Sequence, residues 1–244
     1  MPIETLLLLS AGIFVIAALY SSVGHAGASG YIAVMSLLSL APSVIKPTSL
    51  ALNILVASIA VWQFFRAGHF SWRLFWPFAV PAVPLAFLGG YADLPAHVFK
   101  VILGLVLIFS AVHFLFAVKR DKQILQPPRL QAMSVGAGIG FFSGLTGTGG
   151  GIFLTPILLF MGWAEVKTAA SVSALFILLN SIAGLAGYYA NTNALPSFLA
   201  PLFVAAALGG SIGSYLGSRR FQPVILKRFL AVILFIAGTK LILV

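Results

Sequence analysis

A serine placed between small residues raises the possibility of nucleophilic chemistry in this sequence. Ser29 lies in the stretch GHAGASGY, residues 24–31, within a very apolar part of the chain. A serine nucleophile needs a base within hydrogen-bond reach and donors for the developing oxyanion. His113 is the only histidine well inside a later apolar segment, and nothing in its position argues that it reaches Ser29.

The same stretch also suits a turn at which the backbone approaches a ligand. Glycine permits positive φ and close backbone contact, and a second glycine-rich stretch, TGTGGG at 146–151, precedes another apolar segment. Successive N–H groups in such turns form a concavity that attracts anions, and a helix that begins there adds about half a positive charge. We therefore predict an anion-binding cradle, with close helix packing as the alternative role of these glycines.

The composition indicates which solvent surrounds these elements. Of 244 residues, 61% are hydrophobic and 7% are charged, against about 25% charged residues in ordinary soluble domains. The apolar runs are continuous and do not alternate with polar residues as barrel strands do. The net charge of +10 fits basic residues that flank helices on the cytoplasmic side. We predict a lipid bilayer and no nucleic acid as partner, in the plasma (inner) membrane of a bacterium or archaeon.

Ten apolar segments follow one another along the chain, five in each half. Those that follow Gly27 and Gly149 are short, and we expect half-helices or re-entrant hairpins there because a spanning helix needs about 20 apolar residues. The predicted fold is an all-α polytopic membrane protein with 8–10 transmembrane or re-entrant segments. The segments lie at 3–23, 28–41, 46–66, 73–92, 97–118, 130–145, 150–163, 167–190, 196–217 and 223–243.

The two halves carry an internal repeat. SSVGHAGASGYIAVMSLLSLAPSVIK aligns without gaps with FSGLTGTGGGIFLTPILLFMGWAEVK, which places Lys46 against Lys167, 121 residues further on. Five segments are an odd number, so the second copy enters the membrane from the opposite side, as in many secondary transporters. We predict two inverted-topology repeats, 1–118 and 130–244, joined by a basic cytoplasmic linker at 119–129, with both termini outside the cell.

The second glycine-rich stretch carries a family resemblance. GLTGTGGGIFLTPILL, followed by VKTAASVSALF, resembles the glycine-rich signature of the TauE/SafE sulfite exporter family, also called TSUP. The resemblance extends over nearly the whole chain, through its length, its two halves and its basic linker. It implies transport of small inorganic or organic sulfur anions, sulfite and sulfonates among them, and of related carboxylates. The first half departs from the signature, with His25 and Ser29 in place of Thr146 and Gly150.

Polar residues near both turns are the candidate substrate ligands. Serine, threonine, asparagine and backbone N–H groups offer an oxyanion several donors, although hydrogen bonding between helices is an equal alternative. The two repeat-related lysines either neutralise the anion or extend toward the membrane interface. His25 is the best intramembrane candidate for proton coupling. The predicted substrate-binding residues are His25, Gly27, Ser29, Gly30, Lys46, Ser49, Asn53, Thr146, Thr148, Gly149, Gly150, Gly151, Lys167, Ser171 and Asn180.

These observations predict a transporter, and more specifically an exporter, of a small sulfur-containing oxyanion such as sulfite or a short sulfonate. The substrate would bind near the midplane between the two turns. A passive small-anion channel is one alternative. The other is an intramembrane serine protease, because Gly-Ala-Ser-Gly resembles the rhomboid nucleophile motif, but the repeat replaces Ser29 with Gly150. We expect no enzyme activity, cofactor or metal site, and homo-oligomerisation stays open.

Overall fold

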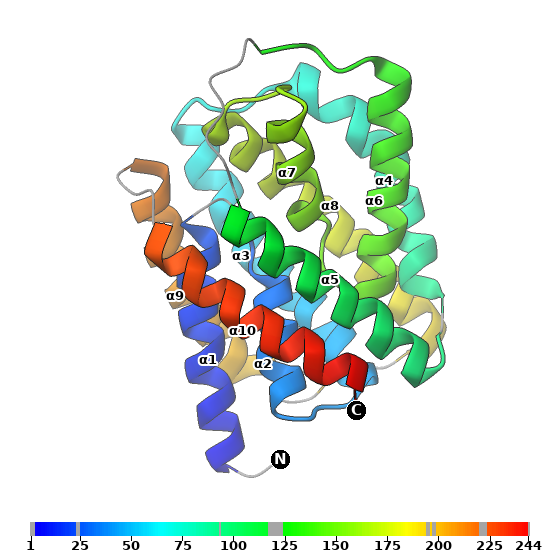
Figure 1. The fold of residues 1–244 in the computed structure, drawn as a ribbon, viewed down its shortest axis with the longest axis vertical. Coiled ribbons are helices and arrows are strands. Elements are labelled where there is room, and N and C mark those ends of the chain that lie inside the picture. Colours follow the sequence, from blue (N-terminus) through cyan, green and yellow to red (C-terminus); the bar gives the residue numbers. More distant parts are fainter. Residues whose placement is uncertain are drawn as a thin grey trace.

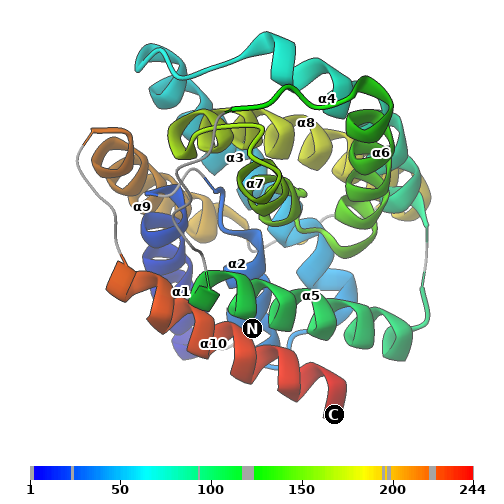
Figure 2. The same cartoon turned by 45° about the horizontal axis from the view of Figure 1, so that its top comes forward.

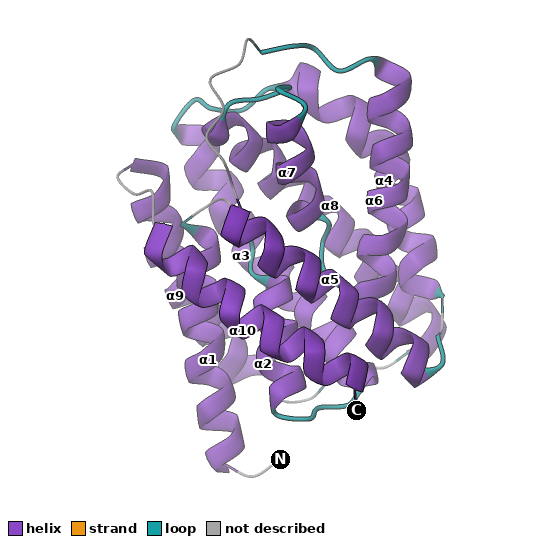
Figure 3. Cartoon of the chain, in the orientation of Figure 1, coloured by secondary structure: helices purple, strands orange, loops and turns teal. Residues whose placement is uncertain are grey.

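The chain folds into a helical bundle in the structure, a computed structural model that describes residues 3–22, 25–92, 94–116, 124–193, 196, 199–219 and 224–243. Over these residues it forms ten α-helices and no strand (Figures 1 and 3). This confirms the predicted all-α class. The helices are α1 (Ile3–Ser21), α2 (Ala28–Leu37), α3 (Pro42–Arg66), α4 (Trp72–Tyr91), α5 (Ala96–Phe116), α6 (Arg129–Thr146), α7 (Gly151–Phe160), α8 (Val166–Thr192), α9 (Leu199–Arg219) and α10 (Val224–Leu243).

Helix lengths separate spanning helices from half-helices. Among the described residues, five helices are long and apolar enough to cross a membrane: α1, α3, α4, α8 and, over Leu199–Leu216, α9. α2 and α7 have ten residues each. At 1.5 Å per residue such a helix is about 15 Å long, half of the ~30 Å hydrocarbon core. The two short apolar segments are therefore half-helices, and the chain is a multi-pass membrane protein.

The arrangement in space places the two half-helices in opposite directions. Figure 1 shows both termini at one end of the bundle and the loop before α6 at the other. α2 ends on the side of the termini, whereas α7 ends on the side of that loop. α5 and α10 lie side by side across one face (Figures 1 and 2). Opposite half-helix directions are what the inverted-repeat interpretation expects.

The helix contacts form matched pairs. α4 packs on α6 and α9 packs on α1, while α3 contacts α9 and α8 contacts α4. α3 and α8, the most buried of the long helices, pack on each other, and so do α5 and α10. Exchanging the first five helices for the last five converts α4–α6 into α9–α1 and α3–α9 into α8–α4, and it leaves α3–α8 and α5–α10 unchanged. Two halves related by a pseudo-two-fold axis would produce this pattern, and the inverted repeat remains our interpretation of it.

Small residues let the backbones of α4, α6 and α8 touch. A Cβ on Gly144 would overlap the carbonyl oxygen of Ala86, and a Cβ on Gly90 would overlap that of Gly184. Lipid tails are as apolar as the helices, so close van der Waals packing of this kind holds such helices together. These contacts fix the position of α8 relative to the end of α6, where the second glycine-rich turn begins.

Two large clusters make up most of the apolar core of the described residues, and a small third cluster joins α3 to α8. The first joins mainly α1, α2, α3, α5, α9 and α10 and includes the fully buried Tyr31 and Leu103. The second joins α4, α6, α7 and α8 and includes Phe78 and Leu154. Many large apolar side chains on the outside of the bundle remain exposed. That distribution is expected when lipid is the surrounding solvent, because an apolar surface there costs nothing.

Candidate substrate site

Each half-helix begins at a glycine in the left-handed region. Gly27 precedes α2 with φ 102°, Gly150 precedes α7 with φ 82°, and neither helix has a side-chain cap. Gly147 and Gly149 also have positive φ, 80° and 74°, a conformation that other residues rarely adopt. The first N–H groups of a helix have no partner within that helix. Both turns therefore place backbone donors at the starts of α2 and α7.

The two turns lie next to each other. A Cβ on Gly151 would lie 3.8 Å from Cδ2 of His25, which is an ordinary van der Waals distance. The backbone N–H of His25 donates to the carbonyl of Tyr20 at 3.0 Å, so the end of α1 fixes the first turn. His25 is buried. Two glycine-rich stretches that are far apart in sequence thus form one buried region.

Helix α3 holds the second turn through a serine. The Oγ atom of Ser49 lies 2.9 Å from the carbonyl oxygen of Gly147 and 3.0 Å from that of Lys46. A hydroxyl has one proton, so it donates to one of these carbonyls at a time. A Cβ on Gly147 would lie 2.8 Å from the same Oγ atom. The turn is therefore in direct contact with α3 at Ser49.

An asparagine and a serine from different halves meet beside the second turn. Nδ2 of Asn53, on α3, donates to Oγ of Ser181, on α8, at 3.3 Å. A Cβ on Gly149 would lie 2.6 Å from that Nδ2 and 2.9 Å from that Oγ. Asn53 and Ser181 are fully buried. The backbone at Gly149 thus faces a polar pair, and only glycine leaves room for it.

Several buried polar atoms on α3, α6 and α8 make no hydrogen bond. Buried polar groups are normally paired, because an unpaired one costs roughly 1–3 kcal/mol. Amide and hydroxyl groups without partners are free to bind a ligand. Within the described part of the chain these atoms include Ser143 Oγ, Asn53 Oδ1, Ser171 Oγ and both amide atoms of Asn180.

Helical periodicity places Asn180 opposite the second turn. One face of α8 carries Phe176, Asn180 and Gly184, which are spaced four residues apart. The Phe176 ring would contact a Cβ on Gly150, and the Gly184 backbone lies against Gly144. Asn180 is between these two contacts, so it faces the segment that connects α6 to α7. The unpartnered amide therefore belongs to the same region as the turn.

Four other predicted residues lie in the interior, and three of them have side-chain hydrogen-bond partners. Ser29 and Tyr20 are joined by a 3.0 Å hydrogen bond between their hydroxyl oxygens, and Gly30 faces α1. Thr146 Oγ1 donates to the carbonyl of Phe142 at 2.6 Å and lies 3.0 Å from Oγ1 of Thr148. These hydroxyls support the ends of the turns, and Ser29 and Gly30 are directed toward α1.

The two repeat-related lysines do not converge on the turns. Nζ of Lys46 lies 2.9 Å from the carbonyl oxygen of Gly90, 3.2 Å from that of Ala92 and 3.3 Å from that of Gly89. A cation at the last carbonyls of a helix is stabilised by hydrogen bonds and by the helix dipole. Lys46 thus caps α4, and Lys167 is exposed at the start of α8. Their predicted role as a symmetric pair at the substrate is not supported by this placement.

Two residues of the region were not among the predicted ligands. Ser181 bonds Asn53, and Ser143 lies at the end of α6, where its Cβ would be 3.3 Å from a Cβ on Gly150. The repeat alignment already paired Ser143 with a serine of the first half, which was a usable signal. Nothing in the sequence distinguished Ser181 from other serines on α8.

The fold and the buried polar region define a class of protein. Apolar helices surround two half-helices whose starts meet inside the bundle, and neutral donors from α3 and α8 lie against the turn before α7. Discontinuous helices of this kind, with their N-termini directed at a central site, are typical of secondary transporters.

The comparisons with known proteins identify the family. The chain belongs to the family described as Sulfite exporter TauE/SafE, which it matches over residues 8–241. It is 44% identical over 239 residues to a probable membrane transporter protein of Sinorhizobium fredii, covering 96% of this chain and 97% of the relative. It is 28% identical over 251 residues to one of Bacillus subtilis, with 95% and 97% covered. No solved structure matches the chain. The protein is thus a membrane transporter and not a protease that uses Ser29.

Proposed function

We propose that this protein exports a small sulfur-containing oxyanion, such as sulfite or a short sulfonate, by alternating access. The substrate binds in the buried region between the starts of α2 and α7. Its ligands are Asn180, Asn53, Ser143 and the backbone N–H groups of the second turn. In this proposal the two halves are inverted repeats that move against each other around that region.

The observation that carries the proposal is the unpartnered amide of Asn180. Its Nδ2 and Oδ1 atoms are fully buried and make no hydrogen bond among the described residues. By its position on α8 this amide faces the segment before α7, and α7 has no side-chain cap. A helix N-terminus favours an anion through its free N–H groups and its dipole. Neutral donors beside it complete the coordination of an oxyanion without adding a full counter-charge.

The distribution of acidic residues also supports an anion over a cation. A cation carrier is expected to place carboxylates in the membrane interior. Glu4 and Glu165 are exposed, and Asp93 and Asp121 lie outside the described residues. Among the described residues no carboxylate is buried, and the polar side chains that touch Gly147 and Gly149, namely Ser49, Asn53 and Ser181, are neutral.

The packing around the turn corresponds to a closed state in this mechanism. Side-chain atoms from α3, α6 and α8 lie 2.6–2.9 Å from the Cβ positions of Gly147, Gly149 and Gly150. An anion can approach the backbone there only after α3 or α8 moves away from the turn. Rocking of one half against the other provides such a movement, since α3 and α8 belong to different halves.

Transport assays in proteoliposomes test the substrate class directly. Purified protein would be assayed in parallel with radiolabelled sulfite, thiosulfate, taurine and sulfoacetate. We expect saturable movement of at least one sulfur oxyanion. Movement that rises linearly with concentration would indicate a passive channel instead. Saturable transport of a cation or neutral solute, with none of these anions moving, would contradict the proposal.

A matched pair of asparagine variants tests the site. Asn180→Leu keeps the number and branching of the side-chain heavy atoms and removes the amide, and Asn191→Leu makes the same change at an exposed position near the end of α8. A hydrogen bond to a charged ligand is worth about 1.5–3 kcal/mol, so Asn180→Leu should raise KM or Kd about 10- to 100-fold. Its thermal stability should be unchanged or raised, because an unpaired amide is removed. A normal KM, or a loss of stability with no change in KM, would exclude this role for Asn180.

A further inference from the structure

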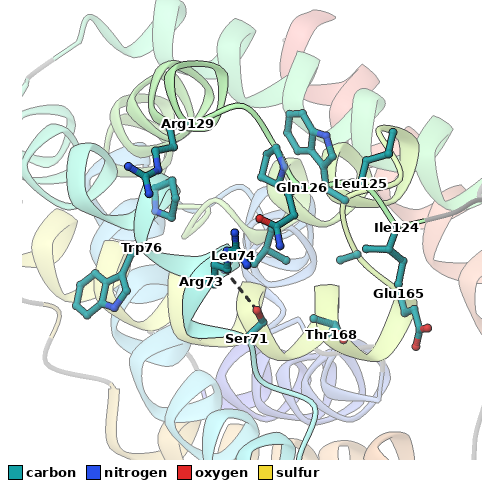
Figure 4. Close-up of a pocket in the computed structure, with 14 residues that line it drawn as sticks. Ser71, Arg73, Leu74, Trp76, Ile124, Leu125, Gln126, Arg129, Glu165 and Thr168 are labelled. Carbon is teal, nitrogen blue, oxygen red and sulfur yellow. Dashed lines mark hydrogen bonds between the residues drawn. The ribbon is translucent and has the colours of Figure 1, made fainter.

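A polar cavity lies away from the glycine turns, at the end of the bundle that carries the loop before α6. Its volume is about 430 Å³, and the linker residues 124–127 form one wall, with α4, α6 and α8 forming the others (Figure 4). The polar and charged residues that line it are Ser71, Arg73, Gln126, Arg129, Glu165 and Thr168.

Three helices begin at this cavity. α6 starts at Arg129, which lines the cavity. α4 starts at Trp72 and α8 at Val166, and each of these residues is next to a lining residue in the sequence. A helix N-terminus carries about half a positive charge and several free N–H donors. Ser71 accepts the N–H of Leu74 at 3.4 Å, whereas α6 and α8 have no side-chain cap. The backbone alone thus makes this end of the cavity favourable for an anion.

The side chains add to this positive charge. Arg73 and Arg129 come from the first turns of two different helices, and Figure 4 shows both on the same side of the cavity. Glu165 lies on the other side, with its carboxylate directed away from them. Guanidinium groups bind oxyanions through two parallel hydrogen bonds, which gives geometric selectivity as well as energy.

The walls of the cavity are held in place. The backbone N–H of Leu125 donates to the carbonyl of Gly162 at 2.8 Å, which fixes the linker to the turn between α7 and α8. Pro127 lines the cavity, and Pro128 follows it at the start of α6. The opposite wall includes Trp163, which is 6% exposed. These contacts hold the walls in place around Arg73 and Arg129, whose side chains are exposed.

We propose that this cavity binds an oxyanion head group, with Arg73 and Arg129 as its ligands. The head group belongs either to an anionic phospholipid of the surrounding bilayer or to a free sulfur oxyanion from the aqueous phase. Basic pockets at membrane surfaces bind lipid head groups by the same chemistry. This site is separate from the one at the glycine turns, and its occupancy does not depend on transport of any substrate.

Direct binding measurements on the full-length protein test the proposal. Radiolabelled sulfate would be titrated against protein purified in detergent, and lipid retention would be measured by native mass spectrometry with phosphatidylglycerol or phosphatidylcholine. We expect the double variant Arg73→Gln/Arg129→Gln to weaken binding of sulfate or retention of phosphatidylglycerol at least tenfold. The control is Arg66→Gln, because Arg66 is exposed at the end of α3 and is not part of the lining. It should bind as the wild type does.

The outcomes distinguish a lipid head group from a free oxyanion, and they distinguish this cavity from the site at the glycine turns. Sulfate binding in detergent that the double variant loses identifies a free oxyanion as the ligand. Selective retention of phosphatidylglycerol, without sulfate binding, identifies the lipid. Asn180→Leu should leave binding of sulfate or phosphatidylglycerol in the cavity unchanged. Binding in the cavity would therefore still be measured if the transport proposal were wrong. If neither ligand binds, or if the double variant binds both as the wild type does, the proposal is wrong.

Discussion

The packing of α4 against α6 predicts opposite effects for one substitution at two positions of the same helix. A Cβ on Gly144 would overlap the carbonyl oxygen of Ala86 and lie 2.7 Å from the backbone N of Gly90. At Gly138, which is exposed on α6, a Cβ meets nothing within 4 Å. Gly144→Ala therefore needs two backbones to separate, whereas Gly138→Ala needs no movement.

The size of the difference follows from these contacts. Overpacking typically costs about 1–3 kcal/mol, and the upper part of that range applies when the obstacle is backbone and cannot rotate away. Gly138→Ala instead gains up to about 1 kcal/mol, because alanine is the better helix former. Because both substitutions on α6 share this gain, the two variants should differ by the packing penalty alone, about 2–3 kcal/mol in the free energy of unfolding. For a chain of this length that is roughly 4–12 °C in Tm.

Thermal unfolding of the purified variants measures this difference. Each variant would be heated in the same mild detergent, and the loss of the monodisperse gel-filtration peak would be followed with temperature. We expect Gly144→Ala to unfold well below the wild type and Gly138→Ala to unfold at or above it. Equal Tm values for the two variants would refute the close approach of α4 and α6 on which the position of the second turn depends.

Two further predictions concern the cap of α4 and the orientation of the chain. Lys46→Gln should lower stability by about 1.5–3 kcal/mol, because it replaces charge-assisted hydrogen bonds to the last carbonyls of α4, while KM for the anion changes less than twofold. A large rise in KM at unchanged Tm would instead restore Lys46 as a substrate ligand. Gln126→Cys should react with an impermeant maleimide in inverted vesicles and not in intact cells, and the chain has no native cysteine to interfere. Labelling from outside intact cells would show that the chain has the opposite orientation.

Local sequence patterns were sufficient for the class of fold and for the position of the half-helices. The apolar runs are continuous, and only 7% of the residues are charged. A chain with this composition requires lipid as its solvent. Two segments too short to span follow glycines, and the structure places half-helices there, with Gly27 and Gly150 in the left-handed region. These features depend only on residue type and on distance along the chain.

The serine and asparagine residues near the turns were partly predictable for the same reason. Ser49, Asn53 and Asn180 are polar residues within apolar helices, so they must face the interior of the bundle, and all three are fully buried. Their partners could not be predicted in this way. Asn53 bonds Ser181, 128 positions further on, and that contact depends on how α3 and α8 cross.

What the sequence determined is thus the solvent, the half-helices and the set of interior polar residues, because each follows from local composition and periodicity. Only the tertiary structure decided the role of each charge. Lys46 and Lys167 are equivalent in the repeat, yet one meets the end of α4 and the other remains exposed. The cavity with Arg73 and Arg129 likewise exists only because three helix starts meet at one place. Such convergence depends on helix crossings between distant segments, which no local pattern records.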